Sequence, residues 1–216
     1  MMRTLVVRPL ADERDAAAWA TRGELAAAAA FSSELRRREY LGWRALVRER
    51  LGRDAAIAYD GVGAPVVTDR AGVHLSVSHA AGWVALLLAD APCGVDIESA
   101  DRDFSCAARR CLTDDERRLS DPPLWPGVAW CAKEALYKLA GRRGLDLRRD
   151  VRLERARLAI DPAAGATVAD PGYFAVDFAA GMTVPAVGEL VGRIAGGEPV
   201  RLAVRCGGGL IVVHTL

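Results

Sequence analysis

Two stretches of the chain repeat apolar residues with the period of an α-helix. Residues 31–52, FSSELRRREYLGWRALVRERLG, form the first pattern, which Ser32 or Ser33 can cap and Gly52 can end. Residues 127–141, GVAWCAKEALYKLAG, form the second pattern and also end in a glycine. Its apolar face consists of Val128, Ala132, Ala135, Leu136 and Leu139. We therefore predict two helices, the second of which places this face on the core.

Short apolar and β-branched runs between glycine-containing turns predict strands around these helices. The runs before the second helix are AAIAYD (55–60), APVVTD (64–69), VHLSVSH (73–79), GWVALLLAD (82–90) and GVDIES (94–99). The runs after it are VRLERARLAI (151–160), GYFAVDF (172–178), VRLAVRC (200–206) and GLIVVHTL (209–216). Residues 99–126 between them are polar, mixed and interrupted by prolines.

One strand-turn-strand pattern occurs twice. Val73 to Leu86 aligns without a gap with Val200 to Val213, and each copy follows a helix. We predict an α/β (α+β) fold: a pseudo-dimer of two similar α/β halves, each a helix packed on a small, mostly antiparallel sheet. The halves are residues 1–98 and 99–216, in one compact unit with the site at their interface. The alternative is that any two hairpins look alike.

Composition excludes several classes of protein. Of the 216 residues, 51% are hydrophobic, which provides a core and argues against disorder. The 29 basic and 28 acidic residues nearly balance, so we expect no nucleic-acid partner. The longest apolar run, WVALLLADAPCGV, is broken by Asp90 and Pro92 and is too short to span a bilayer. The five cysteines form no CxxC pair, which favours a reducing cytoplasm over disulfides or zinc.

Candidate chemistry begins with Asp96 and Glu98 in GVDIES. Residues two apart on a strand point to the same face, where two carboxylates repel each other. A hard cation such as Mg²⁺ would offset that repulsion, because it prefers oxygen ligands. The alternative is a solvated pair of acids at a strand end.

The second helix offers a third carboxylate. Trp130, Glu134 and Lys138 follow at intervals of four, off the apolar face. Glu134 can be a further oxygen for the cation and Lys138 a phosphate ligand, or the two can form an ordinary helical ion pair. The chain has only two lysines, Lys133 and Lys138, against 27 arginines, and this restriction favours the phosphate role.

Two further groups can bind phosphate. Ser78 and His79 end a strand before a glycine turn, where a capping serine and a surface histidine are the alternative. Arg37, Arg44 and Arg48 share a face of the first helix, where the alternative is a solvated basic stripe. Cys131 has no histidine near it in sequence and is interpreted as a packing residue.

Taken together, VSH, GVDIE and WCAKEALYK resemble the 4′-phosphopantetheinyl transferase superfamily, in its larger, monomeric, surfactin-synthetase-activating type. The resemblance covers residues 37–144 by motif and the rest by pattern. It implies a cytoplasmic monomer that moves 4′-phosphopantetheine from coenzyme A to a serine of an apo acyl or peptidyl carrier protein, of fatty-acid, polyketide or nonribosomal-peptide type, releasing 3′,5′-ADP. The alternative is a Mg²⁺-dependent hydrolase of coenzyme A or a related nucleotide.

The resemblance also implies roles for residues. The metal, Mg²⁺ or Mn²⁺, would be held by Asp96, Glu98 and Glu134. Coenzyme A would be bound by Ser78, His79 and Lys138, with Arg44 and Arg48 at its 3′-phosphate. The catalytic residues would be Glu134, which orients or deprotonates the serine hydroxyl, and Lys138, which stabilises the transferring phosphoryl group.

Two departures and one partner surface complete the expectations. The family often has GKP in a turn where this chain has Gly63-Ala64-Pro65, so one basic phosphate contact is missing; it also often has SHS where Ala80 ends SHA here. Residues 101–126 carry Arg109 and Arg110 among Phe104, Leu112 and Leu119. A short amphipathic helix there would present an apolar spot with an arginine rim to an acidic carrier; a solvated loop is the alternative.

Overall fold

The fold is known from a computed structural model, which describes residues 3–121, 123–158, 174–178 and 186–216. Its helices are α1 Glu13–Ala17, α2 Arg22–Ala29, α3 Glu34–Leu51, α4 Ser105–Cys111, α5 Asp114–Arg117 and α6 Trp125–Ala140. Its strands are β1 Arg3–Pro9, β2 Ile57–Tyr59, β3 Pro65–Val67, β4 His74–Ala80, β5 Trp83–Ala89, β6 Val95–Ser99, β7 Val151–Leu158, β8 Phe174–Phe178, β9 Ala186–Ile194, β10 Val200–Gly207 and β11 Leu210–Thr215.

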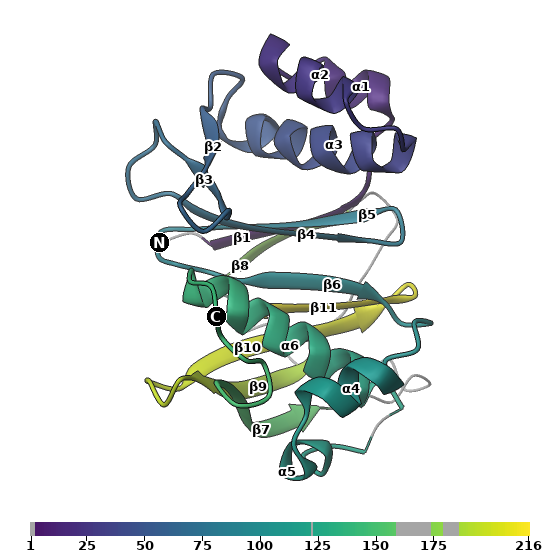
Figure 1. The fold of residues 1–216 in the computed structure, drawn as a ribbon, viewed down its shortest axis with the longest axis vertical. Coiled ribbons are helices and arrows are strands. Elements are labelled where there is room, and N and C mark those ends of the chain that lie inside the picture. Colours follow the sequence, from purple (N-terminus) through teal and green to yellow (C-terminus); the bar gives the residue numbers. More distant parts are fainter. Residues whose placement is uncertain (1–2, 122, 159–173, 179–185) are drawn as a thin grey trace.

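Two sheets form the centre of the molecule (Figure 1). The first has the strand order β4-β5-β1-β8 and the second the order β6-β11-β10-β9-β7, while β2 and β3 form a separate pair. Every pairing between the described strands is antiparallel except that of β1 with β8. The predicted α+β class, with two mostly antiparallel sheets, is therefore confirmed.

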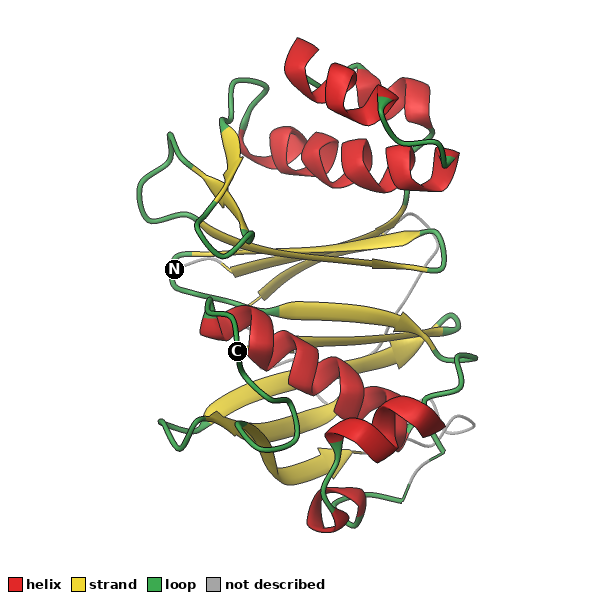
Figure 2. Cartoon of the chain, in the orientation of Figure 1, coloured by secondary structure: helices red, strands yellow, loops and turns green. Residues whose placement is uncertain are grey.

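The apolar residues alternate between the two faces of each sheet, and this alternation produces four layers (Figure 2). Val6 and Leu86 pack against α3, whereas Leu5 and Leu87 lie in the core shared with Ile97 of the second sheet. The other face of the second sheet packs against α6. The order of layers is thus α3, first sheet, second sheet, α6.

The two predicted helices form with the predicted ends. The Ser33 hydroxyl accepts a hydrogen bond from the Arg36 amide at the start of α3, and Gly52 follows its last residue. Gly141 ends α6 with a left-handed φ of 58°. Five elements were not predicted, namely α1, α2, α5, β1 and β9, whereas α4 lies where a short amphipathic helix was expected within residues 101–126.

The repeated pattern corresponds to two hairpins of the same register. Ala80 pairs with Trp83 in the first hairpin, and Gly207 pairs with Leu210, each 127 positions later, in the second. All four turn residues, Ala81-Gly82 and Gly208-Gly209, have φ between 50° and 78°. The equivalence extends to β1 and β6, which lie antiparallel to β5 and β11. These matches support the proposed pseudo-dimer.

The two parts of the chain also exchange strands. β6 lies beside β11 in the second sheet, and β8, from the C-terminal part, lies beside β1 in the first. The predicted boundary after residue 98 falls inside β6, and the division into residues 1–98 and 99–216 stays a prediction.

Candidate functional site

The site lies where β6 meets α6, and Gly94 allows the two to approach closely. A Cβ atom at Gly94 would lie 1.9 Å from the Ala135 carbonyl oxygen of α6, so no other residue fits there. The strand that follows carries Asp96 and Glu98, whose cross-strand partners are Val213 and Ile211. Val213 and Ile211 belong to the core beneath α6, so the two acids lie on the face that α6 covers.

Asp96 is the buried centre of the polar contacts, with 6% of its surface exposed. Its Oδ1 atom accepts a hydrogen bond from the Ser78 hydroxyl at 2.6 Å and from Lys138 Nζ at 2.8 Å. Lys138 Nζ also donates to the Val95 carbonyl at 2.9 Å. The ammonium group of Lys138 is therefore directed to β6, and the alternative of an ordinary helical pair with Glu134 does not describe it.

The other two acids, Glu98 and Glu134, both have raised pKa values. Burial raises the pKa of Glu98, and Asp96 adds to this, although Arg102 and Trp130 oppose it. The Trp130 indole donates to Glu98 Oε1 at 3.2 Å and Arg102 pairs with the same oxygen. Burial likewise raises the pKa of Glu134, with Asp96 and Glu98 adding to it and Lys138 opposing it. Asp96 therefore contributes to the raised pKa values of both glutamates, and the shared metal site predicted from the sequence stays a prediction.

The fit of this set to a cation rests on one oxygen atom. Asp96 Oδ2 is buried and accepts no hydrogen bond of ordinary geometry from the described residues, although the Cys131 thiol lies close enough for a weak hydrogen bond with Asp96 to contribute to its raised pKa. Burial is the main reason that the pKa of Cys131 lies well above its usual value, so this thiol is a packing residue. Among the described residues, no three His, Cys, Asp or Glu side chains are grouped closely enough to form a ready metal cage. The acids are thus neighbours with an unsatisfied oxygen, and the donor type suits Mg²⁺ or Mn²⁺.

Ser78 and His79 point in different directions, as neighbours on a strand must. Ser78 reaches Asp96, whereas His79 Nδ1 lies 3.3 Å from Glu39 Oε1 of α3. The predicted phosphate-binding role of His79 stays a prediction, and the structure adds Glu39 as its neighbour.

A cavity of about 440 Å³ opens beside Lys138. Its lining includes Gly63, Ala64, Pro65, Leu75, Val77, Tyr137, Lys138, Arg142 and Arg143. The turn at Ala64 and Lys138 were predicted from their motifs, whereas Arg142 and Arg143 were not. Their position directly after the C-terminus of α6, four and five residues beyond Lys138, was the available signal.

Arg44 and Arg48 are buried, so the solvated stripe does not describe them, and their predicted role at the 3′-phosphate stays a prediction. They are 2% and 3% exposed. Arg48 donates to both oxygens of Glu24, at 2.8 and 2.9 Å, and Arg44 donates to Tyr59 and stacks on Tyr40. Their partners come from α2, β2 and α3 itself, so these guanidinium groups hold the N-terminal layer together.

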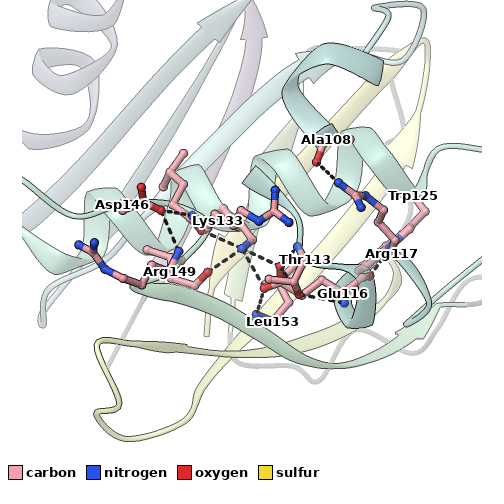
Figure 3. Close-up of polar contacts among 12 residues, drawn as sticks. Ala108, Thr113, Glu116, Arg117, Trp125, Lys133, Asp146, Arg149 and Leu153 are labelled. Atoms are coloured by element: carbon pink, nitrogen blue, oxygen red, sulfur yellow. Dashed lines mark hydrogen bonds and ion pairs between the residues drawn. The ribbon is translucent and has the colours of Figure 1, made fainter. Parts of the chain in front are cut away.

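Lys133 points away from the site, into the core beneath α6 (Figure 3). Its ammonium group is fully buried, 2.8 Å from Glu116 Oε1, and donates to the carbonyls of Leu147 and Val151 at 2.7 Å. Glu116 also accepts from the amides of Thr113 and Leu153. The restriction of lysine to this helix therefore has two causes, one structural at Lys133 and one at the site.

Residues 101–126 were expected to present apolar side chains to a carrier protein, but these side chains are buried in the core. Phe104 and Leu112 are 6% and 1% exposed, and Leu119 packs against the same core. Arg109 and Arg110, in the last turn of α4, are exposed. The apolar part of that expectation is wrong, and the arginines are what the surface offers.

Part of the chain is similar in sequence to known proteins. Residues 92–179 match the family model described as the 4′-phosphopantetheinyl transferase superfamily, a range that includes Asp96, Glu98, Glu134 and Lys138. The protein named 4′-phosphopantetheinyl transferase psf-1, from Bacillus pumilus, is 35% identical over 89 residues, which cover 38% of this chain and 38% of that protein. In the described part of the chain, no helix has the length and apolar character needed to cross a membrane.

Proposed function

Since residues 92–179 match the model of the 4′-phosphopantetheinyl transferase superfamily, we propose that the chain transfers 4′-phosphopantetheine from coenzyme A to a serine of an apo carrier protein, with a divalent metal, releasing 3′,5′-ADP. The matched relative has the same activity in its name. The observation that carries the proposal is the pair of hydrogen bonds from Ser78 and Lys138 to the buried Asp96, with Lys138 also lining a cavity.

The metal would be held by Asp96, Glu98 and Glu134. Asp96 Oδ2 accepts no hydrogen bond of ordinary geometry from the described residues, and a cation would offset the burial and the repulsion that raise the pKa values of Glu98 and Glu134. When bound, Mg²⁺ neutralises charge that develops on the pyrophosphate as its bond breaks. Loading the metal would also require Lys138 to share Asp96, because both approach the same carboxylate.

The residues of the chain would divide the remaining work. Lys138, 28% exposed at its side chain, can turn its ammonium group from Asp96 toward the transferring phosphoryl group. Glu134 lies on the same helix one turn earlier, and its carboxylate would orient the serine hydroxyl or take a proton from it. Ser78 holds Asp96 in place through its 2.6 Å hydrogen bond and can exchange that bond for a phosphate oxygen.

The test is to incubate the chain with coenzyme A, Mg²⁺ and an apo carrier protein and to weigh the carrier. Transfer adds a phosphopantetheine mass to the carrier and produces 3′,5′-ADP. Phosphopantetheine released free in solution would instead reveal a hydrolase, and unchanged coenzyme A would reject both reactions. Omission of divalent metal should abolish transfer, and Mn²⁺ in its place compares the two metals.

We also propose that the carrier docks near Arg109 and Arg110. Both are exposed in the last turn of α4, whereas Arg117 and Arg118 are paired with Asp114 and Asp115. Reversing the charge of Arg109 and Arg110 should raise the Michaelis constant for an acidic carrier and leave that for coenzyme A unchanged. Added salt should weaken carrier use more in the parent than in the variant. An unchanged carrier constant at low salt would reject this surface.

A further inference from the structure

The cavity beside Lys138 has a second basic residue, Arg143, to which the proposed function assigns no role. Lys138 lies at the end next to Asp96, and Arg143 lies at the end next to the Val62-Gly63-Ala64 turn. Leu75, Val77 and Tyr137 are among the apolar residues that line the same cavity. We infer that Arg143 binds the 3′-phosphate of coenzyme A and so replaces, from the other side of the cavity, the basic residue that the turn lacks at Ala64.

The guanidinium group of Arg143 is fixed against that turn. Its Nε donates to the Val62 carbonyl at 2.9 Å, and its Nη2 lies 3.2 Å from where a Cβ atom on Gly63 would stand. Gly63 has a φ of 87°, a conformation that side chains rarely adopt, so the turn presents bare backbone to the arginine. One nitrogen of the group is engaged by the turn, and the others are left to bind an anion bidentately.

Arg143 and its neighbour Arg142 differ in how their charges are compensated. Arg142 is close enough to Asp150 to contribute to the lowered pKa of that acid, after Arg149 and the backbone at Asp146. Its charge is therefore partly compensated by a carboxylate. Arg143 makes its hydrogen bond to a neutral carbonyl, and no carboxylate of the described residues forms an ion pair with it.

The chemistry of the ligand matches two separated cations. Coenzyme A carries a pyrophosphate, whose bond must break beside the metal acids, and a 3′-phosphate on the far side of the ribose. This assignment rests on the proposed function, which places the pyrophosphate at Lys138. The competing explanation is that Arg143 only offsets the negative end of the α6 dipole, an effect that needs no ligand.

Calorimetry with coenzyme A and with 3′-dephospho-coenzyme A separates these explanations without any carrier protein. The Arg143→Ala variant should bind coenzyme A about tenfold more weakly and bind the dephospho compound within about twofold of the parent. Adding Ala64→Lys to that variant should restore affinity for coenzyme A alone. Arg155→Ala, which removes an equally exposed arginine from the far edge strand β7, is the charge-matched control.

Equal losses for both ligands, or no loss for either, would overturn the assignment. The result is also independent of the transfer assay in both directions. If the chain transfers phosphopantetheine but Arg143→Ala still discriminates between coenzyme A and its dephospho form as the parent does, only the role of Arg143 is rejected. A chain that shows the discrimination yet never modifies a carrier rejects the transfer and keeps Arg143 as the 3′-phosphate ligand.

Discussion

Replacing Lys133 by methionine tests the strongest buried contact in the structure. Lys133 and Glu116 are 0% and 1% exposed at their side chains, and the ammonium group is surrounded by Glu116 and two backbone carbonyls. Methionine fills a similar volume but donates nothing. It therefore leaves a buried carboxylate without its cation and the carbonyls of Leu147 and Val151 without their donor.

The expected cost follows from what stays behind. Removing one partner of a buried ion pair typically costs about 3 to 5 kcal/mol. Burial alone would raise the pKa of Glu116, but Lys133 and the amides of Thr113 and Leu153 outweigh it, and the pKa lies below its usual value. Glu116 therefore stabilises the folded state at neutral pH, and this contribution is lost as pH falls through its lowered pKa. Without Lys133 that acid-dependent contribution should shrink or reverse.

Denaturant unfolding followed by tryptophan fluorescence at pH 7 and pH 4 measures both effects. Lys138→Met is the matched control, because it makes the same substitution on the same helix at a partly exposed residue. It should cost less unfolding free energy than Lys133→Met, because Lys138 is 28% exposed at its side chain and Asp96 keeps its hydrogen bond from Ser78, while affecting the reaction far more. If Lys133→Met lowers the free energy of unfolding by less than about 1 kcal/mol, the buried pair between Lys133 and Glu116 is not a major source of stability.

Three further substitutions test the site and its surroundings. Glu134→Gln removes an acid whose pKa is raised above its usual 4.5. In metal-free buffer the substitution should therefore raise the unfolding temperature at pH 7 and leave it unchanged below pH 4. The same change in unfolding temperature at both pH values would contradict the repulsion. Arg48→Met should lower the free energy of unfolding by about 3 kcal/mol, because Glu24 loses both hydrogen bonds from Arg48 and keeps only the longer 3.4 Å pair with Arg44. It should leave the dissociation constant of coenzyme A unchanged in calorimetry, and the reverse pattern would support the phosphate role. Ala81→Gly should stabilise by up to about 1 kcal/mol in denaturant titration, since Ala81 holds a φ of 50°, and a loss of stability would show that its methyl group contributes more than its strain costs.

Much of the fold was predictable because its signals are local. The caps of α3 and α6 and the register of the two hairpins follow from serine, glycine and alternating apolar residues within a few positions. β1 was missed because Leu5, Val6 and Val7 are all buried and do not alternate with polar residues. The partners of β6 and β8 depend on contacts between distant parts of the chain, which local pattern does not encode.

The candidate site was predicted in part for the same reason. Asp96, Glu98, Glu134 and Lys138 share motifs and same-face spacings, and the structure brings them together. The burial of Arg48 was not predictable from α3, because its carboxylate partner comes from a different helix. A basic stripe has the same sequence whether its partner is water, a phosphate or a folded-back glutamate.

The place of β8 beside β1 has a consequence for how the chain acquires its structure during synthesis. β1 is made first, but its parallel neighbour is completed only at residue 178. Until then one edge of the first sheet has open backbone donors and acceptors, which are a template for pairing with other chains. Closing so long a loop is slow relative to forming hairpins. We expect nascent chains released before β8 to need a chaperone, whereas the finished chain should fold as one cooperative unit.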